Sequence, residues 1–183
     1  VDAYVSNSGM VQADGGSVHI NVDTATDLLD NAINMNGFIK ADSVGSENGI
    51  IVIDGGNEGI VDVSGTISAK GEQAGETGGH IEVLGDKVGL FENASIDASG
   101  QDGGGEILVG GDYQGTGDTR RSTATYVSAD STIKADALEN GDGGKVIVWS
   151  DEATRFNGEI SAKGAGDGDG GFTEVSGKKY LNY

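Results

Sequence analysis

The sequence predicts an all-β protein, a parallel β-helix of about six coils with three short strands in each coil. Three observations predict this fold: phrases that recur along the chain, glycine at 34 of the 183 positions, and no proline. Glycine this abundant is usual in collagen and in flexible linkers, but collagen requires proline. Apolar residues make up 36% of the chain and fall in short β-branched runs, which argues against disorder. We therefore expect one β-helical unit over residues 1–183.

The first recurring phrase is an aliphatic residue followed two positions later by alanine. It occurs as Val11-Gln12-Ala13, Ile39-Lys40-Ala41, Ile67-Ser68-Ala69, Ile96-Asp97-Ala98, Ile133-Lys134-Ala135 and Ile160-Ser161-Ala162. The intervals between successive copies are 28, 28, 29, 37 and 27 residues. A period of this length is typical of a solenoid, in which each repeat packs only against its neighbours.

The second phrase begins with glycine and then alternates with period two, as a strand does. It occupies residues 16–20, 49–53, 79–83, 105–109, 144–148 and 171–175. The positions expected to point inward are Val18/Ile20, Ile51/Ile53, Ile81/Val83, Ile107/Val109, Val146/Val148 and Thr173/Val175. Almost all are β-branched aliphatic residues, which suit a stacked ladder in a β core.

A third, looser phrase lies between the other two and completes the coil. It reads Val61-Asp62-Val63, Val88-Gly89-Leu90-Phe91, Thr125-Tyr126-Val127 and Ala153-Thr154-Arg155-Phe156. Three short strands must be joined by tight corners, and glycine reaches positive φ there without a Cβ clash. Proline would remove an N–H from the ladder between coils, so its absence also fits.

The spacing predicts one insertion and two unfinished coils. The 37-residue interval places an insertion at about residues 112–122, in the fourth coil. Residues 3–13 read as a coil without its first strand, and residues 171–183 as a coil without its third. Since neither end shows a capping helix, we expect a segment of a longer β-helix or a subunit that stacks head to tail.

Charge and composition exclude several classes of function. The formal net charge is −19, from 11 basic and 30 acidic residues, and this charge repels nucleic acid and anionic membranes. The longest apolar run, residues 49–53, is far too short to span a bilayer. The chain has no cysteine, which excludes disulfides and thiol chemistry. The adjacent Arg120 and Arg121 are expected to lie in a solvated loop.

Several strings resemble large exoproteins of the filamentous haemagglutinin type. They are residues 96–100 followed by 103–105, then Gly110-Gly111-Asp112-Tyr113-Gln114-Gly115, residues 143–151 and residues 174–178. The likeness covers the chain well from Gly49 onward and more loosely before it. It implies a right-handed β-helix in a secreted bacterial protein, often exported by two-partner secretion and used at the cell surface for adhesion or biofilm. The family's secretion domain carries Asn-Pro motifs, so the absence of proline predicts shaft, not export signal.

Acidic turns at one corner suggest a calcium site. Asp142, Asp167 and Asp169 fall in glycine-rich turns of successive coils. Carboxylates stacked about 5 Å apart repel one another, and Ca²⁺ bridging several oxygens would relieve the repulsion. Aspartate also suits tight turns without any metal, so a purely structural role remains the alternative.

A carbohydrate-active β-helix is the alternative from another class of function. Glu82 and Glu106 are expected on outward positions of adjacent coils and are the pair that could act as acid and base. Lys145 and Arg155 are the candidate basic partners. His19 and His80 are expected in different outward columns, too far apart to share a metal ion.

Outward apolar residues form the last candidate site. Leu108, Ile147 and Trp149 are expected to point away from the core on the fourth and fifth coils. Either the insertion, with Tyr113, folds over them, or they form a docking surface for a neighbouring rod or a glycan ring.

The sequence therefore predicts a structural, non-catalytic segment of an extracellular bacterial filamentous adhesin. Its expected partners are neighbouring coils, copies of itself stacked head to tail, and host or matrix glycans. The only cofactor suggested by the residues is Ca²⁺. We expect neither nucleic-acid binding nor insertion into a membrane.

Overall fold

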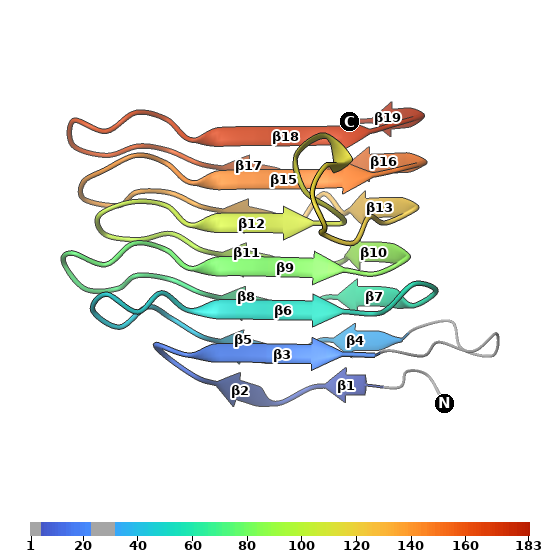
Figure 1. The fold of residues 1–183 in the computed structure, drawn as a ribbon, viewed down its shortest axis with the longest axis horizontal. Helices are drawn as coiled ribbons and strands as arrows, with labels where there is room; N and C mark the ends of the chain where they lie inside the picture. Colours follow the sequence, from blue (N-terminus) through green and yellow to red (C-terminus); the bar gives the residue numbers. More distant parts are fainter. Residues whose placement is uncertain (1–4, 23–31) are drawn as a thin grey trace.

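The computed structural model confirms the parallel β-helix and describes residues 5–22 and 32–183. Within these residues, the strands form three parallel sheets, and each coil contributes one strand to each sheet (Figure 1). The three recurring phrases of the sequence correspond to the three sheets. In the part of the chain that is described, no helix is long and apolar enough to cross a bilayer.

Sheet C is formed by the second phrase. Its strands, in spatial order, are β3 (Ser17–Asn21), β6 (Ile50–Asp54), β9 (His80–Leu84), β12 (Glu106–Val109), β15 (Lys145–Ser150) and β18 (Phe172–Gly177). Every pair is parallel, and the register places equivalent positions of the phrase side by side, such as Ile81 beside Ile107. The repeat therefore sets the register directly.

The other two sheets close each coil. Sheet A contains β1 (Val5–Asn7), β4 (Ile33–Met35), β7 (Ile60–Val63), β10 (Lys87–Leu90), β13 (Ala124–Val127), β16 (Ala153–Phe156) and β19 (Tyr180–Asn182). Sheet B contains β2 (Met10–Gln12), β5 (Phe38–Lys40), β8 (Thr66–Ser68), β11 (Ser95–Asp97), β14 (Thr132–Lys134) and β17 (Glu159–Ser161). The looser third phrase is sheet A, and the Ile-x-Ala phrase is sheet B.

The core is a set of aliphatic stacks that run along the rod. In sheet C, Ile51, Ile81, Ile107 and Val146 lie in one column, and all four are fully buried. Each such side chain contributes about 1.5–3 kcal/mol on burial. On the last coil Val175 is only partly buried, because no further rung covers it among the described residues.

Glycines at the entrance to sheet C allow the coils to stack closely. A Cβ on Gly79 would lie 2.2 Å from the carbonyl oxygen of Gly49, and one on Gly105 would lie 2.1 Å from that of Gly79. These two glycines do not have positive φ. The expectation that corner glycines serve turns is therefore incomplete, since this column serves close approach of one coil to the next.

Carboxylates at the corner between sheets B and C join one coil to the next. Asp42 Oδ1 accepts hydrogen bonds from Ser68 Oγ at 2.6 Å and from the Lys70 backbone N–H at 2.8 Å. Asp136 Oδ1 accepts from Ser161 Oγ at 2.6 Å and the Lys163 N–H at 2.7 Å. These aspartates satisfy backbone donors at turns, where no ladder partner is available.

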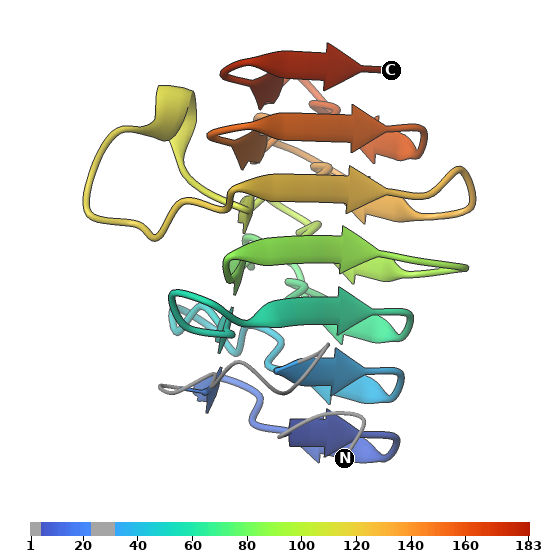
Figure 2. The same ribbon diagram turned by 90° about the vertical axis from the view of Figure 1, so that its right-hand side faces the viewer.

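A long connection, residues 110–123, joins β12 to β13 and projects from the rod (Figure 2). Its one element is the short 3₁₀ turn η1 (Tyr113–Gly115), which begins where Asp112 Oδ1 accepts a hydrogen bond from the Tyr113 N–H. We call residues 110–123 the strap, because this segment crosses the outer face of sheet C.

Candidate functional site

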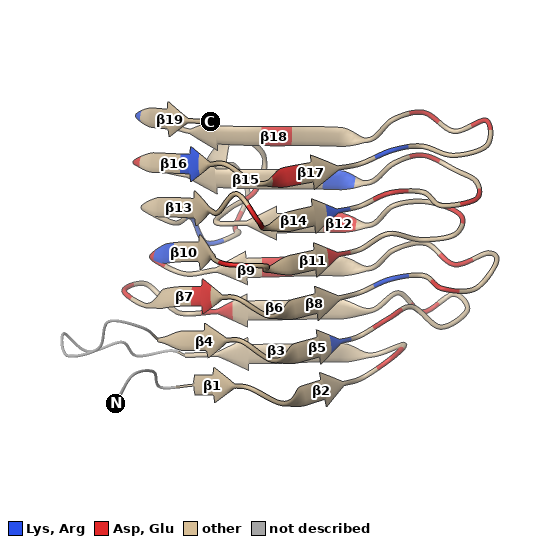
Figure 3. Ribbon diagram, turned by 180° about the vertical axis from the view of Figure 1, so that it is seen from behind, with Lys and Arg blue, Asp and Glu red and all other residues tan. Residues whose placement is uncertain are grey.

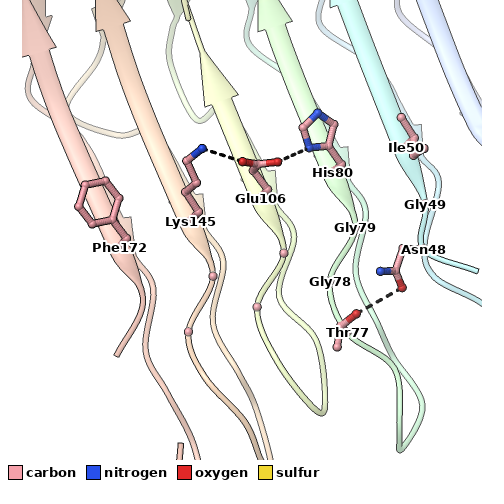
Figure 4. Close-up of a pocket in the computed structure, with 14 residues that line it drawn as sticks. Asn48, Gly49, Ile50, Thr77, Gly78, Gly79, His80, Glu106, Lys145 and Phe172 are labelled. Carbon is pink, nitrogen blue, oxygen red and sulfur yellow. Dashed lines mark hydrogen bonds and ion pairs between the residues drawn. The ribbon is translucent and has the colours of Figure 1, made fainter. Parts of the chain in front are cut away.

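A shallow trough of about 650 Å³ opens where the chain enters sheet C. Glycines that include Gly79, Gly105 and Gly144 line it. One wall is a row of side chains from the first residues of five neighbouring strands: Ile50, His80, Glu106, Lys145 and Phe172 (Figure 4). The parallel register aligns these five positions.

Ion pairs connect this row across successive coils. His80 lies between two carboxylates, with Nε2 2.8 Å from Glu82 Oε1 and Nδ1 2.8 Å from Glu106 Oε2. Lys145 Nζ lies 2.9 Å from Glu106 Oε1 and 2.8 Å from Asp112 Oδ1. The network therefore joins β9, β12 and β15 to the strap.

The pKa shifts of three residues in this network favour their charged forms. The hydrogen bond to Glu82 raises the pKa of His80 above its usual value, and Glu106 adds to this although burial opposes it. Burial lowers the pKa of Lys145, but hydrogen bonds to Asp112 and Glu106 outweigh it and the pKa is raised. Burial raises the pKa of Asp112, but its hydrogen bonds, first to Lys145, bring the net pKa below the usual value.

The structure brings together most of the residues nominated for acid–base chemistry. Glu82 and Glu106 share His80, and Lys145 binds Glu106, as the sequence order suggested. The prediction that Arg155 is a basic partner of these glutamates is wrong, because Arg155 lies on β16 in sheet A, a different face of the coil. Both glutamates are engaged by His80, and Glu106 also by Lys145, an arrangement that links neighbouring coils at the surface.

The strap covers the outward apolar residues Leu108, Ile147 and Trp149, so of the two alternatives the open docking patch is ruled out. The three side chains form a second apolar cluster outside the main core, and they are 2%, 0% and 7% exposed. Backbone of the strap approaches the indole so closely that a Cβ on Gly115 would lie 2.7 Å from the Trp149 ring. Tyr113 stays exposed. The covered alternative is the one the structure shows.

The outgoing half of the strap reaches two coils further along the rod. Tyr113 packs edge-on against Phe172 of β18, with ring centroids 5.5 Å apart. The Gln114 N–H donates to Glu174 Oε2 at 3.2 Å. Together with the Asp112–Lys145 pair, these contacts attach the fourth-coil insertion to the fifth and sixth coils.

Within the returning half of the strap, Arg120 reaches in the opposite direction. Arg120 Nε lies 2.7 Å from Asp54 Oδ1 on β6, and its guanidinium also binds Asn57. Arg121 Nε lies 3.2 Å from Asp151 Oδ2. The expectation of a solvated arginine pair is therefore wrong for Arg120. No local pattern signals a partner 66 residues away.

The acidic turns do not gather into a metal cluster. Asp142, Asp167 and Asp169 are all exposed, and Asp142 Oδ1 accepts the backbone N–H of Asp169 at 2.7 Å. Among residues 5–22 and 32–183, no group of three or more acidic or histidine side chains is arranged to hold a metal. His19 and His80 lie in different columns of sheet C, as expected. Calcium binding stays a prediction, to be tested by calorimetric titration and by melting in chelator.

The fold is a parallel β-solenoid, and a solved structure confirms the resemblance to exoproteins of the filamentous haemagglutinin type that was inferred from the sequence. The chain is similar to the HMW1 secretion domain from Haemophilus influenzae, with a TM-score of 0.82 and 34% sequence identity. The likeness covers 97% of this chain and 45% of that one, so the chain spans less than half the length of the solved domain. Comparison with protein-family models and with curated proteins finds no match. That this chain is shaft and not export signal stays a prediction.

Proposed function

We propose that this chain is a structural, non-catalytic β-helical segment of a secreted bacterial exoprotein that acts at the cell surface, in adhesion or in a biofilm matrix. The observation that carries the proposal is the unbroken stacking of three parallel ladders around one aliphatic core. Such a stack resists bending and stretching, because neighbouring coils are hydrogen-bonded to each other in all three sheets. Similarity to a secretion domain supports export of the protein that contains this segment.

Exposed apolar groups at both outer coils support stacking along the axis. A cavity of about 390 Å³ at the last coil is lined by Ile160, Val175 and Leu181, among others. On the first described coil, Val11 occupies the column that ends at Ile160, and it is 37% exposed. A further coil or another copy placed at either end would continue the column of Val11 and Ile160 with an aliphatic residue.

Electron microscopy of the purified chain tests the axial part of this proposal. We expect filaments or strings of rods, and Leu181→Asp should shorten them by placing a charge in the stacking interface. Monodisperse short rods at high concentration would contradict stacking.

Surface location is tested separately, in the producing bacterium. Protease added to intact cells should release fragments of this segment, whereas a cytoplasmic marker should stay whole. Protection of the segment until the cells are lysed would contradict a surface role.

A carbohydrate-active or carbohydrate-binding role is the second candidate. The feature that favours it is the trough, with Glu82, Glu106 and Lys145 along one side. Turnover of an acidic or neutral polysaccharide, lost in Glu82→Gln, would establish catalysis and overturn the structural proposal. Binding without turnover would add a glycan ligand to the rod.

A further inference from the structure

A second groove lies on the outer face of sheet A, away from the trough and the strap, which both lie on sheet C. Its volume is about 350 Å³, and its lining is almost entirely apolar. Ala124 and Ala153 are neighbours in register and leave a depression, because their side chains are short. Tyr126 and Arg155 line one side, and Tyr180 follows Ala153 in the next coil.

The groove combines aromatic surface with positive charge. Phe91 and Tyr126 pack with ring centroids 5.2 Å apart, and the Phe91 ring lies over Gly89, where a Cβ would be 2.1 Å from it. Lys87 and Arg155 line the same groove. Arg155 is exposed, and among the described residues no carboxylate lies within ion-pair distance of it. Lys87 Nζ lies 3.4 Å from Asp86 Oδ2, so Arg155 is the cation that a ligand in the groove would meet, in a chain of net charge −19.

These properties define the ligand that fits. An apolar side chain would fill the depression and release water from the alanine and aromatic surfaces. A carboxylate beside it would pair with the Arg155 guanidinium. A sugar fits less well, because the groove offers few hydrogen-bonding groups for its hydroxyls and burying them unpaired is unfavourable. The groove therefore favours an acidic peptide segment with an apolar anchor.

The chain itself carries such a segment. Leu138 is 51% exposed in the turn after β14, and Glu139, also exposed, follows it. Seen from behind, acidic segments lie along these turns at one side of the rod, with basic segments among them (Figure 3). The basic positions on β10 and β16 lie at the other side, where β7 carries an acidic segment (Figure 3). β13, with Ala124, and the Leu138 turn belong to the same coil. A copy shifted sideways, without a shift along the axis, would thus bring Leu138 level with the groove.

We propose that copies of this chain associate side by side and in register, with Leu138 of one copy in the sheet A groove of the next and Glu139 paired with Arg155. The contact joins two different surfaces, so it leaves a free groove on one copy and a free turn on the other and can repeat into a lateral array. This inference goes beyond the axial stacking proposed above and does not depend on it.

Sedimentation velocity of the purified chain over a range of concentrations and salt tests the proposal. The wild type should associate, and more weakly at high salt, because an ion pair at the rim of an interface is screened. Leu138→Asp should weaken the association by about tenfold or more, as expected for an anchor residue. Val44→Asp is the matched control, because Val44 is 54% exposed in the equivalent turn of the second coil.

A charge exchange makes the test specific. Arg155→Glu and Glu139→Arg should each weaken association, and the double variant Arg155→Glu/Glu139→Arg should restore it to near the wild-type level. Circular dichroism would confirm that each variant is folded. A wild type that stays monomeric throughout, equal loss in Leu138→Asp and Val44→Asp, or no restoration in the double variant would each overturn the proposal. Association lost in Leu181→Asp but kept in Leu138→Asp would also overturn it and point to axial stacking. Binding of a glycan in the groove without self-association would assign the groove a different occupant.

Discussion

Gly115→Ala should lift the strap from Trp149, and the contact geometry sets the size of the effect. Gly115 has a φ of 63°, and an added Cβ would lie 2.7 Å from Cε2 and Cζ2 of the indole. A left-handed conformation costs an alanine about 1–2 kcal/mol. Carbon atoms pack best at about 3.5–4.0 Å, so the backbone or the ring must also move by roughly 1 Å.

Gly117→Ala is the matched control for backbone strain. Gly117 has a φ of 74°, but the nearest atom to its added Cβ is Asp112 Oδ2 at 3.8 Å, an ordinary contact. Part of the strain in both variants is offset by about 0.4–1 kcal/mol, because alanine restricts the unfolded chain. We expect a loss of about 1 kcal/mol for Gly117→Ala and about 2–3 kcal/mol for Gly115→Ala, the difference coming from the lost packing on the indole.

Fluorescence reads out this contact directly, since Trp149 is the single tryptophan of the chain. In the wild type the indole is 7% exposed, so its emission should be blue-shifted and poorly quenched by acrylamide. Gly115→Ala should shift the emission to the red and increase quenching, while Gly117→Ala should leave both near wild type. Equal spectra for the two variants, or a solvent-exposed indole in the wild type, would refute the reasoning about the strap.

Three further predictions concern stability. Ile107→Ala in the fully buried core should cost about 2–5 kcal/mol in urea unfolding, whereas Ile50→Ala, at a 41% exposed position, should change it by less than about 0.5 kcal/mol. Similar losses in both variants would contradict the assignment of inward and outward columns. The raised pKa of His80 means that its protonated form stabilises the fold fully below its unfolded pKa of about 6.5, and this stabilisation is lost as pH rises through the folded pKa. His80→Gln should flatten that part of the stability profile, and an unchanged slope would show that other groups cause it. Arg120→Ala should lower stability by about 0.5–1.5 kcal/mol at low salt because its ion pair is largely shielded, and the more exposed Arg121→Ala should have a smaller effect. The reverse order would count against the half-buried pair as an anchor of the strap.

The sequence predicted the architecture well, because the signals for it are local and repeated. Period-two alternation identifies the strands of sheet C, and the interval between copies of the Ile-x-Ala phrase aligns them from coil to coil. Once Ile81 stands beside Ile107, every other position of the two strands is determined, including His80 beside Glu106. Part of the charged row could therefore be predicted from the repeat alone.

The sequence was less informative wherever the repeat is interrupted or the partner is remote. It placed an insertion before β13 but could not trace its path, so whether Trp149 lies open or covered stayed undecided. The Arg120–Asp54 pair spans two coils in one direction and the Tyr113–Phe172 contact spans two in the other. Arg155 falls in the third phrase, as the sequence indicates, but that phrase forms sheet A, so Arg155 cannot partner glutamates on sheet C.

The sequence by itself determined the coil, its three strands and the aliphatic columns. The reason is that the repeats stack in register, so the aliphatic residues at equivalent positions pack on one another in the core. Only the tertiary structure decided which outward residues are accessible. An outward Leu108 and an outward Ile50 of sheet C cannot be distinguished by alternation alone, yet one is 2% exposed and the other 41%. The difference comes from the strap, whose path depends on contacts with the second, fifth and sixth coils and not on its own periodicity.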